Sequence, residues 1–172
     1  MKVKTHNYYS DFGVRQICHA LKSKNQFIKT IAIIHVSNYF LKQKCINNNS
    51  VLIPAPQHQG NAEYTLRITR RIARKTGAKV LDILKCKPHE SLYKWKKSEE
   101  YTGLPSLDIG LYLSKKISDE DKIKNVFFVD NVISTGKTYN EANKLLNGIL
   151  EPMVYAIDFD KIKLNGGLKY DF

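Results

Sequence analysis

The sequence of 172 residues holds little cysteine and no long apolar run, and each shortage excludes a class of protein. Its three cysteines, Cys18, Cys45 and Cys86, form no CxxC pair and cannot all pair with one another, which argues against a structural zinc site. No apolar run reaches the roughly 18 residues of a membrane span, and the first six residues lead into no signal-peptide core. We therefore expect one domain, 1–172, in the reducing cytoplasm, with no membrane partner.

Arginine is also scarce, with five among the 28 basic residues, although the net charge is +12. A charge of this size suggests an anionic partner, such as nucleic acid or a phosphorylated small molecule. Alternatively, a chain rich in lysine and asparagine reflects genome base composition and has no binding role. Four arginines, Arg67, Arg70, Arg71 and Arg74, form a ridge on a predicted helix, which is either a solvated face or a surface for an anionic partner.

The hydrophobic pattern alternates between helix and strand periods along the chain. It predicts helices over 11–23, 26–43, 61–76 and 138–147, and strands over 51–53, 79–84, 107–113, 126–129 and 153–159. This order indicates an α/β fold with a largely parallel central sheet and flanking helices. Residues 1–45 form the N-terminal helical part. Residues 87–106 have no periodicity and are expected to form a flexible lid loop.

The segment 126–138 carries the clearest chemical signal: a buried strand, an acidic residue, a loop of small residues and the start of a helix. Successive backbone N–H groups and a helix amino end together make a phosphate cradle. Gly136 would let the phosphate approach the backbone closely. Asp130 can accept hydrogen bonds from sugar hydroxyls. Three hydroxyls can donate to the phosphate: those of Ser134, Thr135 and Thr138.

Two known patterns compete for this segment. Gly136, Lys137 and Thr138 match the end of a nucleotide-binding P-loop, but Asn131 stands where that pattern has its first glycine. All thirteen positions resemble the signature of the type I phosphoribosyltransferase family: four apolar residues, two acidic residues, two variable ones and a Thr/Ser-Thr-Gly-x-Thr loop. The one departure is Asn131, where the family usually has a second carboxylate.

The resemblance extends to the ComF-like branch of that family. Residues 8–22 resemble its N-terminal helix, 51–58 resemble its Val-Pro-Val-Pro loop, and 61–76 resemble the helix that follows. The four-cysteine zinc ribbon that often precedes this domain is absent, and the branch's polar pattern is degraded at 90–94. These departures argue against the DNA-uptake role of ComF proteins.

The resemblance implies a type I phosphoribosyltransferase fold and an enzyme that moves ribose 5-phosphate from phosphoribosyl pyrophosphate to a nitrogenous base, with Mg²⁺, releasing pyrophosphate. It implies that the 5′-phosphate is held by Ser134, Thr135, Gly136, Lys137 and Thr138. It further implies that the Pro54–Gln57 loop, with Ala55, Pro56 and Gln57, offers backbone N–H groups to the pyrophosphate.

The catalytic candidates are Asp130, Asn131 and Lys94. The first two would hold the ribose hydroxyls, Asp130 would also contact a Mg²⁺ ion carried mainly by the substrate, and Lys94 lies in the predicted lid. Because Asn131 removes one negative charge beside the sugar, we expect slow turnover. The alternative function is a weakly active or inactive phosphoribosyl-pyrophosphate-binding protein, regulatory or associated with DNA. The acceptor base, a nucleic-acid partner and a homodimer stay open.

Overall fold

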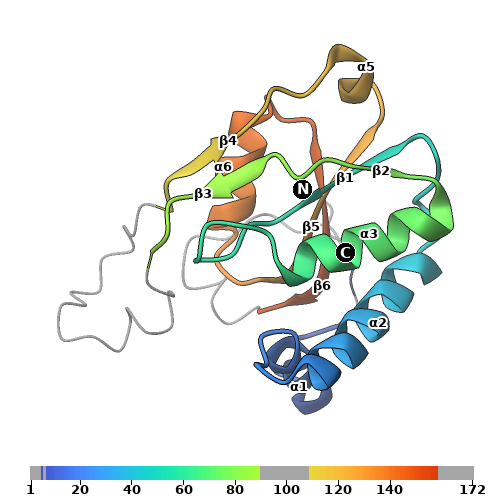
Figure 1. Ribbon diagram of the computed structural model, residues 1–172, viewed down its shortest axis with the longest axis vertical. Coiled ribbons are helices and arrows are strands. Elements are labelled where there is room, and N and C mark those ends of the chain that lie inside the picture. The colour runs from blue at the N-terminus through green and yellow to red at the C-terminus, as the bar shows by residue number, and fades with distance from the viewer. Residues whose placement is uncertain (1–4, 6, 90–108, 159–172) are drawn as a thin grey trace.

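The computed structural model describes residues 5, 7–89 and 109–158 and contains a four-stranded parallel sheet with the order β2-β1-β5-β6 (Figure 1). The strands of this sheet are β1 (Ser50–Pro54), β2 (Lys79–Val80), β5 (Asn125–Ile133) and β6 (Leu150–Ile157). A separate antiparallel pair consists of β3 (Leu84–Cys86) and β4 (Leu111–Leu113). The predicted α/β class with a largely parallel sheet and flanking helices is confirmed.

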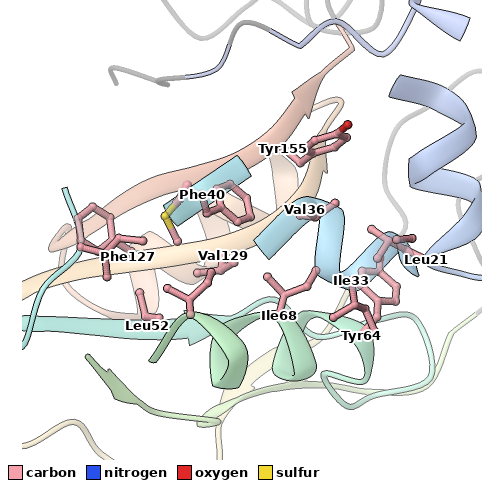
Figure 2. Close-up of a cluster of buried hydrophobic side chains, with 14 of the residues drawn as sticks. Leu21, Ile33, Val36, Phe40, Leu52, Tyr64, Ile68, Phe127, Val129 and Tyr155 are labelled. Atoms are coloured by element: carbon pink, nitrogen blue, oxygen red, sulfur yellow. The ribbon is translucent and has the colours of Figure 1, made fainter. Parts of the chain in front are cut away.

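The helices cover both faces of the sheet. They are α1 (Phe12–Ala20), α2 (Gln26–Lys42), α3 (Tyr64–Thr76), α5 (Asp119–Lys122) and α6 (Lys137–Leu145). The first three share a core with one face, and Figure 2 shows Val36 and Phe40 of α2 with Ile68 of α3 packed toward the strands. Helix α6 packs on the opposite face.

The two faces of β5 follow from alternation along the strand. Phe127 and Val129 belong to the core under α2 and α3, whereas Val126 and Phe128 belong to the core under α6. Each of these four side chains is at most 6% exposed. A strand that is apolar on both faces fits only the interior of a sheet covered by helices on both sides, which is the position that β5 occupies.

The N-terminal segment closes the β6 edge of the sheet. Tyr8 bridges Ile157 in parallel, the Ile157 N–H donates to the Asn7 carbonyl, and the Tyr9 N–H donates to the Ile157 carbonyl. Unpaired strand edges invite pairing with other chains. The start of the chain therefore covers a stretch of backbone that would otherwise stay exposed.

Several sequence predictions for regular elements are wrong in part. The helix expected over 61–76 begins at Tyr64, and of the strand expected over 107–113 the described part begins at Leu111. The strand expected over 79–84 ends at Val80, and Leu84 begins a different strand, β3. The two are separate because β3 belongs to the second sheet, where Leu84 pairs with Leu113 of β4. The helix expected over 138–147 begins at Lys137 and ends at Leu145, which is 38% exposed. The buried face of that helix runs through Tyr139 and Ala142 and continues at Leu146 just past its end.

The lid prediction falls largely outside the described residues. At its start, the Lys87 N–H donates to the Gly110 carbonyl and the His89 N–H donates to the His58 carbonyl. The rest of the predicted lid, including Lys94, lies outside the described residues. In the portion that the structure describes, no helix is both long enough and apolar enough to cross a membrane.

Candidate functional site

The carboxyl ends of β1 and β5 form a topological switch point. These strands are neighbours, but β1 leads through α3 to β2 on one side, whereas β5 leads through α6 to β6 on the other. The two helices cover opposite faces of the sheet, so the loops after β1 and β5 diverge. Open parallel sheets bind ligands in the crevice outside such a pair of strand ends. The fold therefore directs attention to the loops that follow Pro54 and Ile133.

The loop after β5 leads directly into the amino end of α6. Gly136 has a φ of 73°, a left-handed conformation that glycine adopts without steric cost. The Thr135 hydroxyl oxygen accepts from the Lys137 N–H at 3.3 Å. No side chain caps α6 at Gly136, whereas the Asn25 and Ser118 side chains cap α2 and α5. An uncapped helix amino end presents N–H groups and a partial positive charge, which suits an anion.

The loop is shorter than the sequence predicted, since β5 continues past Asp130 to Ile133. The Asp158 N–H donates to the Ile133 carbonyl at 2.9 Å and continues the pairing with β6. Of the five expected phosphate contacts, Ser134, Thr135 and Gly136 form the turn, and Lys137 and Thr138 begin α6. All five are thus contiguous at one helix amino end.

Asp130 lies inside β5 and is only partly exposed. Burial raises the pKa of its carboxyl group from 3.8 to about 6, and this is the largest influence. Two influences oppose it: the Asn131 N–H donates to Asp130 Oδ1 at 2.7 Å, and the Lys22 ammonium favours the charged form. A carboxylate in this setting gains from any ligand that donates to it or brings positive charge.

The described residues form no cluster of three or more His, Cys, Asp or Glu side chains that could hold a metal ion by themselves. Mg²⁺ commonly binds one or two carboxylates and takes its remaining oxygens from substrate phosphates and water. The single carboxylate of Asp130 fits that pattern. It does not fit a metal cage built from protein side chains alone.

Asn131 is packed under the helices rather than open to the crevice. Its side chain is 5% exposed, and its Oδ1 accepts from the Tyr64 hydroxyl at 3.0 Å. Its Nδ2 has no oxygen or nitrogen partner among the described residues and lies in the neighbourhood of the Cys18 thiol. Burial raises the pKa of that thiol to about 12, although Lys22 and the amide lower it. In this arrangement Asn131 connects β5 to α1 and α3, and its amide oxygen already accepts a hydrogen bond.

The loop after β1 differs from the expectation drawn from the sequence. Pro54 and Pro56 have no N–H, the Ala55 N–H donates to the Val129 carbonyl at 2.9 Å, and the Gln57 N–H donates to the Asn61 carbonyl at 3.1 Å. All the backbone donors of Pro54–Gln57 are therefore used inside the chain. This geometry corrects the expectation that the backbone N–H groups of Pro54–Gln57 are offered to the pyrophosphate.

Gln57 has a structural role that sequence reasoning missed. With its amide oxygen turned toward α3, this oxygen accepts from the N–H groups of Glu63 and Tyr64, at 3.1 and 3.0 Å. Those N–H groups at the helix start have no partner within the helix. A glutamine seven residues before the first residue of a helix carries no established capping signal, so only the tertiary structure reveals this cap. The sequence likewise carries no signal for the hydrogen bond that the Tyr64 hydroxyl donates to Asn131 Oδ1.

A comparison with models of known protein families gives no match, and no curated protein matches the sequence. The functional argument therefore depends on the residues and on their geometry.

Proposed function

We propose that this chain binds phosphoribosyl pyrophosphate with Mg²⁺ and transfers ribose 5-phosphate to a nitrogenous base, releasing pyrophosphate, on a type I phosphoribosyltransferase fold. The observation that carries the proposal is the uncapped amino end of α6, preceded by left-handed Gly136, at the switch point between β1 and β5. This arrangement suits a phosphomonoester such as the 5′-phosphate of the substrate.

The phosphate would be held by the loop and by the first turn of α6. The N–H groups at the helix start point along the helix axis, and the hydroxyls of Ser134, Thr135 and Thr138 lie in the same short segment. Such charge-assisted hydrogen bonds are about twice as strong as neutral ones. In this proposal the phosphate is the anchor that positions the sugar carbon for attack.

Asp130 would accept hydrogen bonds from the ribose hydroxyls. Because burial holds its pKa at about 6, the carboxylate is ionised at pH 7.5 but poorly solvated. Sugar hydroxyls would replace the missing water and stabilise the charged form. Mg²⁺, when bound with the substrate, would supply positive charge to the leaving pyrophosphate. Substrate affinity should therefore fall as the pH is lowered through 6, when Asp130 takes up a proton.

A second candidate is a phosphoribosyl-pyrophosphate-binding protein with little turnover. Two observations favour it. The Asn131 amide oxygen accepts a hydrogen bond from Tyr64, and the backbone N–H groups of Pro54–Gln57 donate hydrogen bonds within the chain. No side chain caps α6 at Gly136 in the proposed phosphate half of the site, whereas the proposed pyrophosphate half has no backbone donor from the Pro54–Gln57 loop. Tight binding of pyrophosphate itself is then not expected.

The test compares three ligands with and without Mg²⁺: phosphoribosyl pyrophosphate, ribose 5-phosphate and pyrophosphate. Melting temperature reports binding, since a ligand that binds only the folded state stabilises it by mass action. Pyrophosphate release with a panel of nitrogenous bases reports transfer. We expect both ribosyl phosphates to raise the melting temperature and phosphoribosyl pyrophosphate to release pyrophosphate with at least one base.

The outcomes separate the candidates. Stabilisation without pyrophosphate release would favour the binding protein over the enzyme. Stabilisation by pyrophosphate alone, or by none of the three ligands, would contradict both. Repeating the titration at pH 5.5 and 7.5 tests Asp130: equal affinity at the two values would remove it from the site.

A further inference from the structure

The scarce arginines of this protein are concentrated in one place. Four of the five lie on α3 and line a groove of about 250 Å³ against α2, beside Thr30, Ile33 and Ile34. The lining arginines are Arg67, Arg70, Arg71 and Arg74. The two helices lie side by side in Figure 1 and pack along much of their length. The many lysines of the chain do not contribute to this lining.

Among the described residues, hydrogen bonds orient part of this arginine cluster, but no carboxylate neutralises its positive charge. Arg67 donates to the Thr30 hydroxyl at 3.0 Å and to Gln26 Oε1 at 3.5 Å, which orients it across the groove. Arg71 Nε is buried without a hydrogen-bond partner. Within the described residues, no carboxylate forms an ion pair with any of the four. The nearby Glu63 carboxylate is paired with Lys29 instead.

The opposite wall of the groove continues into an apolar surface. Helix α2 buries Ala32, Val36 and Phe40 toward the sheet, yet the first half of its outer side is apolar as well. Phe27 and Ile31 are 74% and 50% exposed, and Ile34, on the same side, is 36% exposed and reaches the groove. A surface helix normally places polar side chains on its outer side. An apolar outer side next to unpaired guanidinium groups indicates a partner.

We propose that the α2–α3 groove binds an acidic amphipathic helix of another protein. Arg67, Arg71 and Arg74 follow the i, i+4, i+7 spacing of one helix face. Carboxylates with the same spacing on a partner helix can each meet a guanidinium in bidentate geometry. Leucine or isoleucine side chains on the adjacent face would cover Phe27, Ile31 and Ile34, as in other helix-in-groove complexes.

Other occupants fit less well. A second copy on a two-fold axis would bring two sets of arginines together. A nucleic-acid backbone would match the charge but leave the apolar row of α2 in water. A bilayer surface is flat and would not reach into a groove. The site also extends away from the proposed active site, because Arg70, Arg71 and Arg74 lie beyond the first turn of α3, whereas Gln57 and the crevice lie at its start.

The experiment uses the full chain and a fluorescein-labelled synthetic peptide that carries Glu at i, i+4, i+7 and i+11 and Leu on the adjacent face. The reference probe is a peptide of the same composition in scrambled order. Fluorescence anisotropy should show binding of the patterned peptide that is about tenfold or more tighter than that of the scrambled one. Arg70→Glu/Arg74→Glu should weaken binding at least about tenfold, and Ile31→Ser should also weaken it.

Matched controls have the same charge or polarity change elsewhere. Lys115→Glu/Lys116→Glu alters two exposed lysines outside the groove, and Leu145→Ser alters an exposed apolar residue of α6. Both should leave binding within about twofold. Circular dichroism checks that each variant folds.

Four results would overturn the proposal. The first is equal affinity for the two peptides, and the second is equal loss in the groove and control variants. The third is tighter binding to a 20-nucleotide oligothymidine, or to vesicles of phosphatidylcholine and phosphatidylserine, that depends on the same arginines. The fourth is self-association of the chain that Ile31→Ser abolishes.

Discussion

The loops after β1 and β5 leave neighbouring strands at the same edge of the sheet, yet they use their backbone donors in opposite ways. The Pro54–Gln57 loop has two prolines and two N–H groups that donate within the chain, and its glutamine caps α3. In the loop from Ser134 to Gly136, the Thr135 hydroxyl accepts from the Lys137 N–H, but the N-cap residue Gly136 has no side chain to cap α6. A helix end that the chain caps itself is satisfied without a ligand, whereas an uncapped one at a switch point is available to an anion.

The largest expected effect comes from the loop after β5. Gly136→Val puts a β-branched side chain at a φ of 73° and beside the phosphate, so it should abolish the rise in melting temperature with ribose 5-phosphate. Gly148→Val is the matched control, because Gly148 has a φ of 81° and open space around it. That control should lose similar stability but keep the ligand response. A ligand response that survives Gly136→Val would place the phosphate elsewhere.

Asp130→Asn should weaken ligand binding and yet stabilise the free protein. The folded state holds the Asp130 proton up to a pKa of about 6, whereas the unfolded state releases it near 3.8. Stability is therefore lost as the pH rises through this window, by roughly 3 kcal/mol at most. The variant should melt several degrees higher than wild type at pH 7.5 and nearly equally at pH 4.

The exposed Asp11, which makes no side-chain cap bond, provides the control for this pH comparison. Asp11→Asn should not change the melting temperature at either pH. An Asp130→Asn variant that melts below wild type at pH 7.5 would mean that the carboxylate is stabilised by contacts in the free protein, contrary to our account.

Tyr64→Phe tests the connection between α3 and β5. Removing the hydroxyl leaves Asn131 Oδ1 buried without its donor, which should cost about 1–3 kcal/mol in the free energy of unfolding. Denaturant titration measures this loss. Adding Asn131→Leu removes the second polar partner and should recover part of the stability. If the double variant is no more stable than the single one, the bond to Tyr64 does not account for the effect.

The smallest effect is expected in the loop after β1. Gln57→Ala removes the cap of α3 and should cost about 1 kcal/mol of stability, while the affinity for ribose 5-phosphate stays the same. Gln57→Glu keeps an acceptor at the helix start and should preserve stability. A loss of ribose 5-phosphate affinity in Gln57→Ala would show that the two loops act together, which would break the contrast drawn between them.

The sequence predicted best the elements that consist of apolar side chains or end at a clear stop signal. Four apolar residues in a row, 126–129, indicated a buried strand, and the helix expected to end at 76 does end there, followed by Gly77 in a left-handed conformation. The continuation of β5 to Ile133 could not be predicted from these residues. The polar pair Asp130 and Asn131 is typical of a strand end, and only pairing with β6 extends the strand.

The proximity of the residues proposed to hold the phosphate, 134–138, was predictable because they are contiguous, so it needs no tertiary information. The orientation of Asn131 was not predictable, since Tyr64 and Cys18 come from distant parts of the chain. The same holds for Ala55, whose N–H is used by the neighbouring strand. Sequence patterns indicate which groups are present, but which donors are already used depends on the packing of distant segments.

The pairing of residues 7–9 with Ile157 has a consequence for biosynthesis. The first described residues complete the sheet edge beside the last strand, and the Thr5 hydroxyl also donates to the Tyr155 carbonyl across 150 positions. A ribosome releases the N-terminal segment long before β6 exists. The unit from β1 to β2 can form locally during translation, but this closure must wait until β6 has emerged, which makes it a later folding event than the formation of that unit.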